Sequence, residues 1–230
     1  MDLKSKIEQF AETLTPGERA GLKLLLANAV AETIDVGLLK NASVAAVAYK
    51  TCVATINRLQ LHKDLIPYNG VVYRGYPDFF TNNILSELIK ESELLRNSAI
   101  KFHDHFVVSN APFAKKIALS AELHKLLSDA VGNIVPTGKA NYIYYDEIGL
   151  GIEPHIDNED FSLNVILMLK HEYTNSQSAL VLYPLDEVPE KIFLKPGELV
   201  IFFADSIIHA RERMSKNEKL TIVAFGFKPV

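Results

Sequence analysis

Three residues in the last third of the chain have the types and the spacing of a metal-ligand set. His155 and Asp157 are separated by a single residue, and His209 follows later in the sequence. Two histidines and one carboxylate bind a non-haem Fe(II) on one face, which leaves the other positions of the ion open for a co-substrate and for oxygen. The sequence therefore predicts an oxidative metalloenzyme.

Two strands are needed to bring these ligands together. Residues two apart on a strand project from the same face, so His155 and Asp157 can reach one ion from a strand or its continuation. A Pro196-Gly197 turn and the apolar run 199–203 precede His209, and this pattern predicts a buried strand. We expect that second strand to deliver the third ligand.

The last apolar run of the chain carries a cation on a predicted buried face. Residues 219–227 have the composition of a strand, and period two places Lys219 and Thr221 on the same face as Val223, Phe225 and Phe227. A lone buried ammonium is costly unless it is paired. An anionic ligand would pair it, so Lys219 is a candidate anion-binding residue.

In these features the chain resembles the Fe(II)/2-oxoglutarate-dependent dioxygenase superfamily. The family pattern is His-x-Asp, then a second His, then a basic residue that is followed two positions later by Ser or Thr. His155-x-Asp157, His209, Lys219 and Thr221 match this pattern. The run 196–202 before the second His and the approach 145–154 to the first also match. The resemblance covers residues 140–230, is weaker from residue 70, and does not extend to residues 1–60.

The resemblance implies an α+β fold with a double-stranded β-helix (jelly roll) core, helices packed on it and an N-terminal helical segment. It implies Fe(II) on His155, Asp157 and His209, O2 as oxidant, and 2-oxoglutarate held by Lys219 with help from Thr221. Further candidates for contact with 2-oxoglutarate are Asn141, Tyr144 and Tyr145, on the strand before the first ligand.

The implied reaction is the oxidation, most simply the hydroxylation, of a substrate C–H bond, with succinate and CO2 as co-products. Relatives that halogenate have Gly or Ala at the position of Asp157, so the carboxylate here favours hydroxylation or a related oxidation. Arg211 and Arg213 are rival anchors for 2-oxoglutarate, because lysine makes only a point-charge contact with a carboxylate. The second cluster, His103-Asp104-His105, has no supporting context and is interpreted as a polar strand face or rim.

Several functions remain open at this stage. A small metabolite or natural-product intermediate is the expected substrate, and a protein or a carrier-bound substrate is the alternative. A cupin-like metal-binding barrel without 2-oxoglutarate chemistry would keep the three ligands and would not need Lys219. With 24 basic and 28 acidic residues and a net charge of −4, nucleic acid is disfavoured as a substrate. We expect substrate specificity to lie in loops 158–161, 171–178 and 205–208.

Composition and patterning predict the organisation of the chain. Its single cysteine, Cys52, excludes an intrachain disulfide, and no apolar run has membrane-spanning length, so we expect a soluble cytoplasmic protein. We predict an N-terminal helical segment at 1–62, with a capping box at Thr15–Glu18, and a jelly-roll domain at 63–230. The amphipathic front helices need an apolar partner, either the sheet or a second subunit in a homodimer.

The expected elements of the second domain alternate before strands dominate. We expect helices over 82–97 and 114–131, and strands over 71–73, 102–108, 140–145, 162–169, 179–183, 190–194, 199–203 and 220–227.

Overall fold

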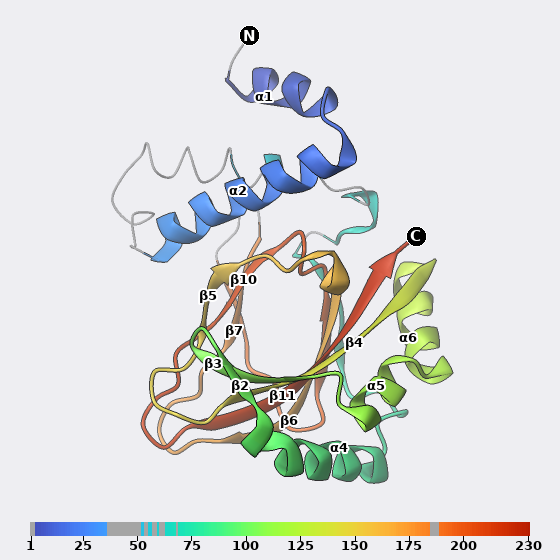
Figure 1. Ribbon diagram of the computed structural model, residues 1–230, viewed down its shortest axis with the longest axis vertical. Coiled ribbons are helices and arrows are strands. Elements are labelled where there is room, and N and C mark those ends of the chain that lie inside the picture. The colour runs from blue at the N-terminus through green and yellow to red at the C-terminus, as the bar shows by residue number, and fades with distance from the viewer. Residues whose placement is uncertain are drawn as a thin grey trace.

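Two antiparallel sheets face one another and form the core of the protein (Figure 1). The computed structural model describes residues 3–35, 52, 55, 56, 59, 63–67, 69–184 and 189–230. The larger sheet has seven strands in the order β1-β9-β6-β11-β4-β3-β2, and the smaller has four in the order β5-β10-β7-β8. This arrangement confirms the predicted α+β fold with a double-stranded β-helix core.

The strands are β1 (Val71–Gly75), β2 (Ile100–Phe102), β3 (His105–Ser109), β4 (Ile134–Tyr145), β5 (Ile152–His155), β6 (Leu163–Glu172), β7 (Leu180–Tyr183), β8 (Glu190–Ile192), β9 (Leu199–Phe202), β10 (Ile208–Arg211) and β11 (Lys219–Pro229). The α-helices are α1 (Leu3–Glu12), α2 (Pro16–Asp35), α4 (Asn82–Leu95), α5 (Pro112–Ala118) and α6 (Ala121–Val131). Single 3-10 turns lie at Lys63–Leu65, Arg96–Ser98 and Glu159–Phe161.

Two predicted elements are divided in the structure. The strand expected over 102–108 is a hairpin of β2 and β3, because His103 adopts a left-handed φ of 50° and turns the chain. The helix expected over 114–131 is two helices, because Ser120 caps α6 by accepting a hydrogen bond from the Leu123 amide. The short strands β5 and β10, which carry the predicted ligands, had no separate apolar signal in the sequence.

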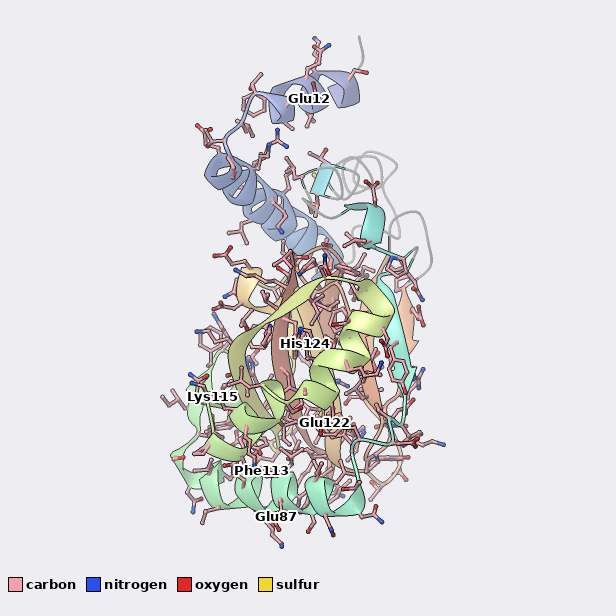
Figure 2. The ribbon with its side chains drawn as sticks, turned by 90° about the vertical axis from the view of Figure 1, so that its right-hand side faces the viewer. Glu12, Glu87, Phe113, Lys115, Glu122 and His124 are labelled. Atoms are coloured by element: carbon pink, nitrogen blue, oxygen red, sulfur yellow. The ribbon has the colours of Figure 1, made fainter. Side chains whose placement is uncertain are left out.

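The larger sheet is buried on both of its faces. Its outer face packs against α4, α5 and α6 through a core that includes Leu88, Leu127, Val223 and Phe225. Figure 2 shows these helices over the sheet, with Glu87 on α4, Phe113 on α5 and Glu122 and His124 on α6. The inner face packs against the smaller sheet through a second core. Alternate residues of β4 and β11 therefore face two different apolar environments.

The N-terminal segment begins as predicted. The capping box is formed: the Thr15 amide donates to Glu18 at 2.9 Å, and the Glu18 amide donates to the Thr15 hydroxyl at 3.4 Å. Helix α2 lies against β5, and a small core of Ile56, Ile156 and Ile208 joins it to the smaller sheet. The predicted packing of this segment on the barrel is thus present for α2.

Other predictions for the front of the chain are not tested by these residues. Residues 36–51 and most of 53–62 of the predicted helical segment lie outside the described residues. The domain boundary predicted between residues 62 and 63 and the predicted homodimer remain predictions. Among the described residues, no helix is long and apolar enough to cross a membrane.

The loop between β10 and β11 is held by one buried carboxylate. Glu218 accepts hydrogen bonds from the amides of Ser178 (2.6 Å) and Ser215 (2.9 Å) and from the His171 imidazole (2.8 Å). Burial acts to raise the pKa of Glu218, but these hydrogen bonds lower it to about 2. The carboxylate therefore fixes the loop that leaves the strand of His209.

Replacing Glu218 is expected to destabilise the protein. Glu218→Gln turns an amide NH2 toward backbone donors and should lower the free energy of unfolding by roughly 2–3 kcal/mol at pH 7. Because the folded pKa is depressed, the stabilisation is present above the unfolded value near 4.5 and is lost as pH falls toward 2. Urea denaturation across this pH range measures both effects, with the exposed Glu172→Gln as control. Identical midpoints for Glu218→Gln and wild type would contradict this role.

Candidate metal centre

The structure brings His155, Asp157 and His209 together inside the barrel. His155 ends β5, and its partner across the ladder is His209 on β10. One ligand atom from each of the three residues lies within 4.8 Å of the other two. The Asp157 carboxylate is 3.4 Å from Nε2 of His155 and 3.8 Å from Nε2 of His209. Two imidazole nitrogens and one carboxylate thus converge on a single point, as a metal on one face requires.

Backbone carbonyls orient both imidazoles for metal binding. Nδ1 of His155 lies 2.7 Å from the carbonyl of Glu153, and Nδ1 of His209 lies 3.0 Å from that of Ile207. Each carbonyl accepts the Nδ1 proton, which leaves the Nε2 lone pair directed at the ion. Burial and the neighbouring His155 lower the pKa of His209 to about 4, so this ring is neutral and able to coordinate at pH 7.

Asn164 supports the carboxylate ligand. Its Nδ2 donates to Asp157 at 2.8 Å from the neighbouring strand β6. Burial acts to raise the pKa of Asp157, but the two imidazoles and this hydrogen bond lower it, so the group is ionised. Asn164 was not among the site residues predicted from the sequence. Its signal was an isolated amide within the apolar run 163–169.

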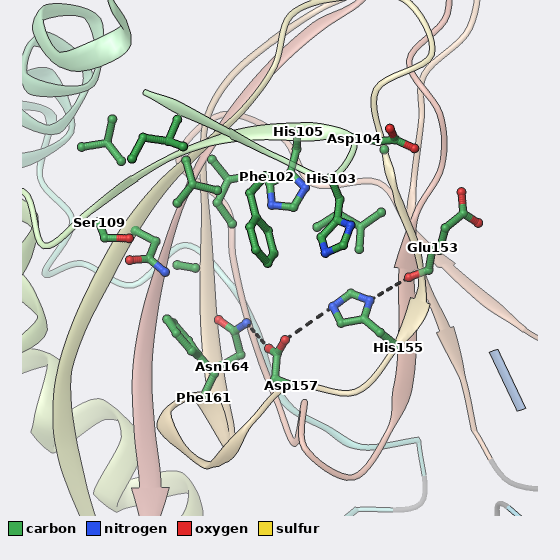
Figure 3. A pocket seen from close by; sticks show the side chains of 18 of the residues that line it. Phe102, His103, Asp104, His105, Ser109, Glu153, His155, Asp157, Phe161 and Asn164 are labelled. Carbon is green, nitrogen blue, oxygen red and sulfur yellow. Dashed lines mark hydrogen bonds and ion pairs between the residues drawn. The ribbon is translucent and has the colours of Figure 1, made fainter. Parts of the chain in front are cut away.

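A cavity of about 1020 Å³ opens beside the three ligands, between β3, β4 and β5 (Figure 3). Asn141 lines it, and the Oδ1 atom of this side chain is buried with no hydrogen-bond partner in the part of the chain that the structure describes. Tyr145 is fully buried in the core between the two sheets, on the same face of β4. The structure therefore places Asn141 and Tyr145 on the side of the sheet where a co-substrate would lie.

Tyr144 does not belong to this group. It lies on the opposite face of β4, and its hydroxyl donates to the backbone carbonyl of Ser92 on α4 at 2.7 Å. Its role is to pack the helix on the sheet.

Lys219 and Thr221 are also placed away from the cavity, against the expectation from the sequence. They share the face of β11 that carries Val223 and Phe225, and this face packs on the helices outside the barrel. Lys219 is exposed, and Thr221 is half-buried. The inner face of β11 presents Leu220 and Ile222 instead. A sheet that is buried on both faces offers no apolar contrast to show which face is the inner one.

Arg211 is a cation that the structure places inside the barrel. It follows His209 by two residues on β10, and the two residues pair with Leu180 (Arg211) and Leu182 (His209) of β7, which belong to the inner core. Only 4% of Arg211 is exposed, and its Nη2 has no hydrogen-bond partner among the described residues. Burial lowers the pKa of Arg211, but a guanidinium remains charged in proteins.

The carboxylates nearest to Arg211 have other partners. Glu218 is held by the loop described above, and Glu212 binds Lys191 and the amide of Ala179. The third rival, Arg213, is exposed at the rim, where it binds Asp104 and Glu153. A buried, unpaired guanidinium is strongly unfavourable, so the interior is suited to an anion supplied from outside.

The residues that line the cavity only partly coincide with the loops in which the sequence predicted substrate specificity. Asn158 and Phe161 line the cavity, but loops 171–178 and 205–208 do not. The β2–β3 hairpin contributes more, including His103, Asp104 and His105. The interpretation of this cluster as a polar strand face or rim fits the exposed Asp104 but not His105, which is only 6% exposed and faces the cavity.

Comparison with known proteins identifies the fold. No protein-family model matches the sequence, and no curated protein matches it significantly. Solved structures do match. The 2-oxoglutarate-dependent epimerase SnoN from nogalamycin biosynthesis superposes with a TM-score of 0.60 at 12% identity, over 70% of this chain and 77% of that one.

Two further structures show the same fold. A prolyl-4-hydroxylase from Pseudomonas putida matches with a TM-score of 0.55 at 13% identity, over 77% of this chain and 99% of its own. HygX from Streptomyces hygroscopicus, solved with nickel, 2-oxoglutarate and hygromycin B, matches with a TM-score of 0.56 at 12% identity, over 74% and 88%. The chain has the fold of the Fe(II)/2-oxoglutarate oxygenases, and it carries the His-x-Asp and His triad within that fold.

Proposed function

We propose that this chain, with the fold of the Fe(II)/2-oxoglutarate oxygenases, is an Fe(II)- and 2-oxoglutarate-dependent enzyme that oxidises a C–H bond of a small molecule, most simply by hydroxylation. The observation that carries the proposal is the assembled triad of His155, Asp157 and His209 beside an open cavity. The donor set fits Fe(II), since two imidazoles and one carboxylate on one face leave room for further ligands.

When bound, the iron would activate O2, which is the oxidant, and 2-oxoglutarate would supply two electrons to it on conversion to succinate and CO2. The three ligands would hold the metal, and the Glu153 and Ile207 carbonyls would keep the imidazoles in the coordinating tautomer. Asn164 would keep Asp157 ionised and oriented. The protein's part in the reaction is to orient the reactants and exclude water.

We assign the distal carboxylate of 2-oxoglutarate to Arg211. A dicarboxylate with one end at the metal needs a cation further along the inner face, and two residues of a strand advance about 7 Å. Arg211 lies at that step from His209, is buried, and has an unsatisfied Nη2. Its planar guanidinium can bind a carboxylate through two hydrogen bonds, which the exposed ammonium of Lys219 could not provide from outside the barrel.

Tyr145 and Asn141 support this assignment from β4. Burial raises the pKa of Tyr145 above its usual range, so the phenol keeps its proton and can donate a hydrogen bond to an anion. Asn141 directs an amide into the cavity, with one atom still unpaired. We infer that both side chains contact 2-oxoglutarate, and that Tyr144, Lys219 and Thr221 do not.

Turnover of 2-oxoglutarate tests the proposal. With Fe(II), O2 and 2-oxoglutarate the protein should form succinate slowly even without a substrate, and a chelator should stop it. The control is Asp157→Ala, which should form none. A protein that binds Fe(II) but neither binds nor consumes 2-oxoglutarate would instead be a metal-binding barrel without this chemistry.

A further inference from the structure

The N-terminal helical segment contacts the parts of the smaller sheet that carry the metal ligands. Helix α2 lies across the end of the barrel beside β5, the strand that ends at His155 (Figure 1). The chemistry proposed above uses no residue of this segment. Its contacts nevertheless reach the residues that flank all three ligands.

An apolar core joins the segment to the outer side of the ligand-bearing strands. The three ligands face the inside of the barrel. The alternation of an extended chain therefore turns Ile156, which lies between two of them, and Ile208, which precedes the third, to the outside. There both isoleucines are buried with Ile56, and Leu26 of α2 packs against this core. The segment thus covers the backs of both ligand-bearing stretches.

A polar link reaches the turn 204–207, between β9 and β10. Lys23 of α2 lies 3.4 Å from the carboxylate of Asp205 in this turn, and the Ser206 hydroxyl donates to the same carboxylate at 2.6 Å. The Lys23 and Asp205 side chains are only 14% and 16% exposed, so salt screens this ion pair less than a surface pair. Lys23 and Leu26 are three residues apart, so one face of α2 makes both contacts.

The turn 204–207 positions two of the ligands directly. The carbonyl of Ala204 accepts a hydrogen bond from the Asp157 amide at 2.8 Å, and the carbonyl of Ile207 lies 3.0 Å from Nδ1 of His209. Asp205, which α2 contacts, lies between these two carbonyls in the sequence. A displacement of the turn would therefore move a carboxylate ligand and an imidazole ligand relative to one another.

We propose that the N-terminal segment, through Lys23, Leu26 and Ile56, is a positioning element of the metal centre, and that its docking holds the three ligands at the spacing that a metal requires. Docking and metal binding are then coupled in both directions: a change that weakens docking weakens iron binding, and iron strengthens docking by the same factor. The proposal rests on the proposed function only for the identity of the metal.

Iron affinity of the folded protein tests this role. The double variant Lys23→Gln and Leu26→Ala should weaken Fe(II) binding about tenfold, since it removes both contacts of α2 with the ligand-bearing elements. Anaerobic calorimetry on the full chain, well below the unfolding temperature of each variant, measures the loss. Lys23→Gln alone should weaken binding about threefold. This single variant leaves the apolar core in place, so it tests the same link where the loss of Leu26 impairs folding.

Matched controls on α6 separate positioning from general stability. Leu127→Ala removes a fully buried leucine from the core on the outer face of the larger sheet, and Lys125→Gln removes a lysine from its ion pair with Asp129. Leu127→Ala should destabilise the fold at least as much as the double variant, because Leu26 is only half-buried. Both controls should keep iron affinity within about twofold of wild type. Wild-type iron affinity in the double variant, or an equal loss in Leu127→Ala, would overturn the proposal.

Hydrogen exchange tests the coupling in the reverse direction. Fe(II) should slow amide exchange in α2 of the wild-type protein, because metal binding favours the docked segment, and should leave exchange in α6 unchanged. Asp157→Ala, which lacks one ligand, should show no slowing. Exchange in wild-type α2 that does not respond to Fe(II) would refute the coupling and with it the positioning role.

The outcome is separable from that for the proposed function. Binding of 2-oxoglutarate is read in the same samples from its visible charge-transfer absorption with Fe(II). If this absorption is absent while the double variant still binds iron more weakly than wild type, the proposed function fails and the positioning role stands. If the absorption forms and the double variant binds iron as wild type does, the positioning role alone fails.

Discussion

Replacing His209 with alanine is expected to abolish iron binding and turnover of 2-oxoglutarate while leaving the fold intact. The ring is buried and, among the described residues, its polar contacts are the Ile207 carbonyl and the fellow ligand Asp157, so its loss removes one of three protein ligands and no extended network. His155→Ala and Asp157→Ala should have the same effect. Calorimetric titration with Fe(II) under anaerobic conditions measures it, and circular dichroism reports on the fold.

Graded controls make this prediction specific. Asn164→Leu removes a hydrogen bond to Asp157 but no ligand, so iron affinity should fall by only roughly 10–100-fold. His124→Ala removes an imidazole from α6 and should leave iron affinity unchanged. If all three ligand variants bound iron as wild type does, the metal centre would be assigned to the wrong residues.

Replacing Arg211 with methionine should have two opposite effects. Affinity for 2-oxoglutarate should fall by about 100-fold, on the order of 3 kcal/mol, because two charge-assisted hydrogen bonds are lost. The protein without co-substrate should become more stable, since an unpaired buried charge is replaced by an apolar chain of similar length. Iron affinity should hardly change, because Arg211 is not a ligand.

The matched comparison is Lys219→Met. The sequence pattern assigns the anchor to Lys219, whereas the structure places it exposed on the outer face of β11. We expect this variant to bind 2-oxoglutarate as wild type does. Thermal denaturation of both variants, and anaerobic titration of both with 2-oxoglutarate, would decide whether Arg211 or Lys219 is the anchor. A large loss of affinity in Lys219→Met, with little change in Arg211→Met, would restore the prediction made from the sequence.

The metal ligands could be predicted from the sequence because their signal is local. His155-x-Asp157 follows the alternation of a strand, although Asp157 lies just beyond β5. The turn and apolar run before His209 predict a strand that is β9 of the larger sheet, and His209 itself lies on the next strand, β10. The alternation of β11 was also identified correctly. The sequence could not show which of the two faces of β11 lines the barrel. Val223 and Phe225 pack on helices as fully as Leu220 and Ile222 pack in the barrel.

The other wall of the cavity depends on contacts distant in sequence. His105 gains its position from the β2–β3 hairpin, which depends on the left-handed turn at His103. A non-glycine residue is uncommon in that conformation, so the run 102–108 has the pattern of one strand. Arg211 is likewise distinguished only by what surrounds it, because its two neighbouring carboxylates are taken by partners from other parts of the chain.

The most direct test of the proposed function is an anaerobic titration of 2-oxoglutarate into the Fe(II)-loaded protein, followed by visible absorption. Chelation of the iron by the co-substrate produces a metal-to-ligand charge-transfer band. We predict that the band appears in wild type and saturates at one equivalent of 2-oxoglutarate. It should be absent from His209→Ala, and in Arg211→Met it should need far more 2-oxoglutarate to saturate. An iron-loaded wild-type protein that shows no band at any concentration of 2-oxoglutarate would contradict the proposed function.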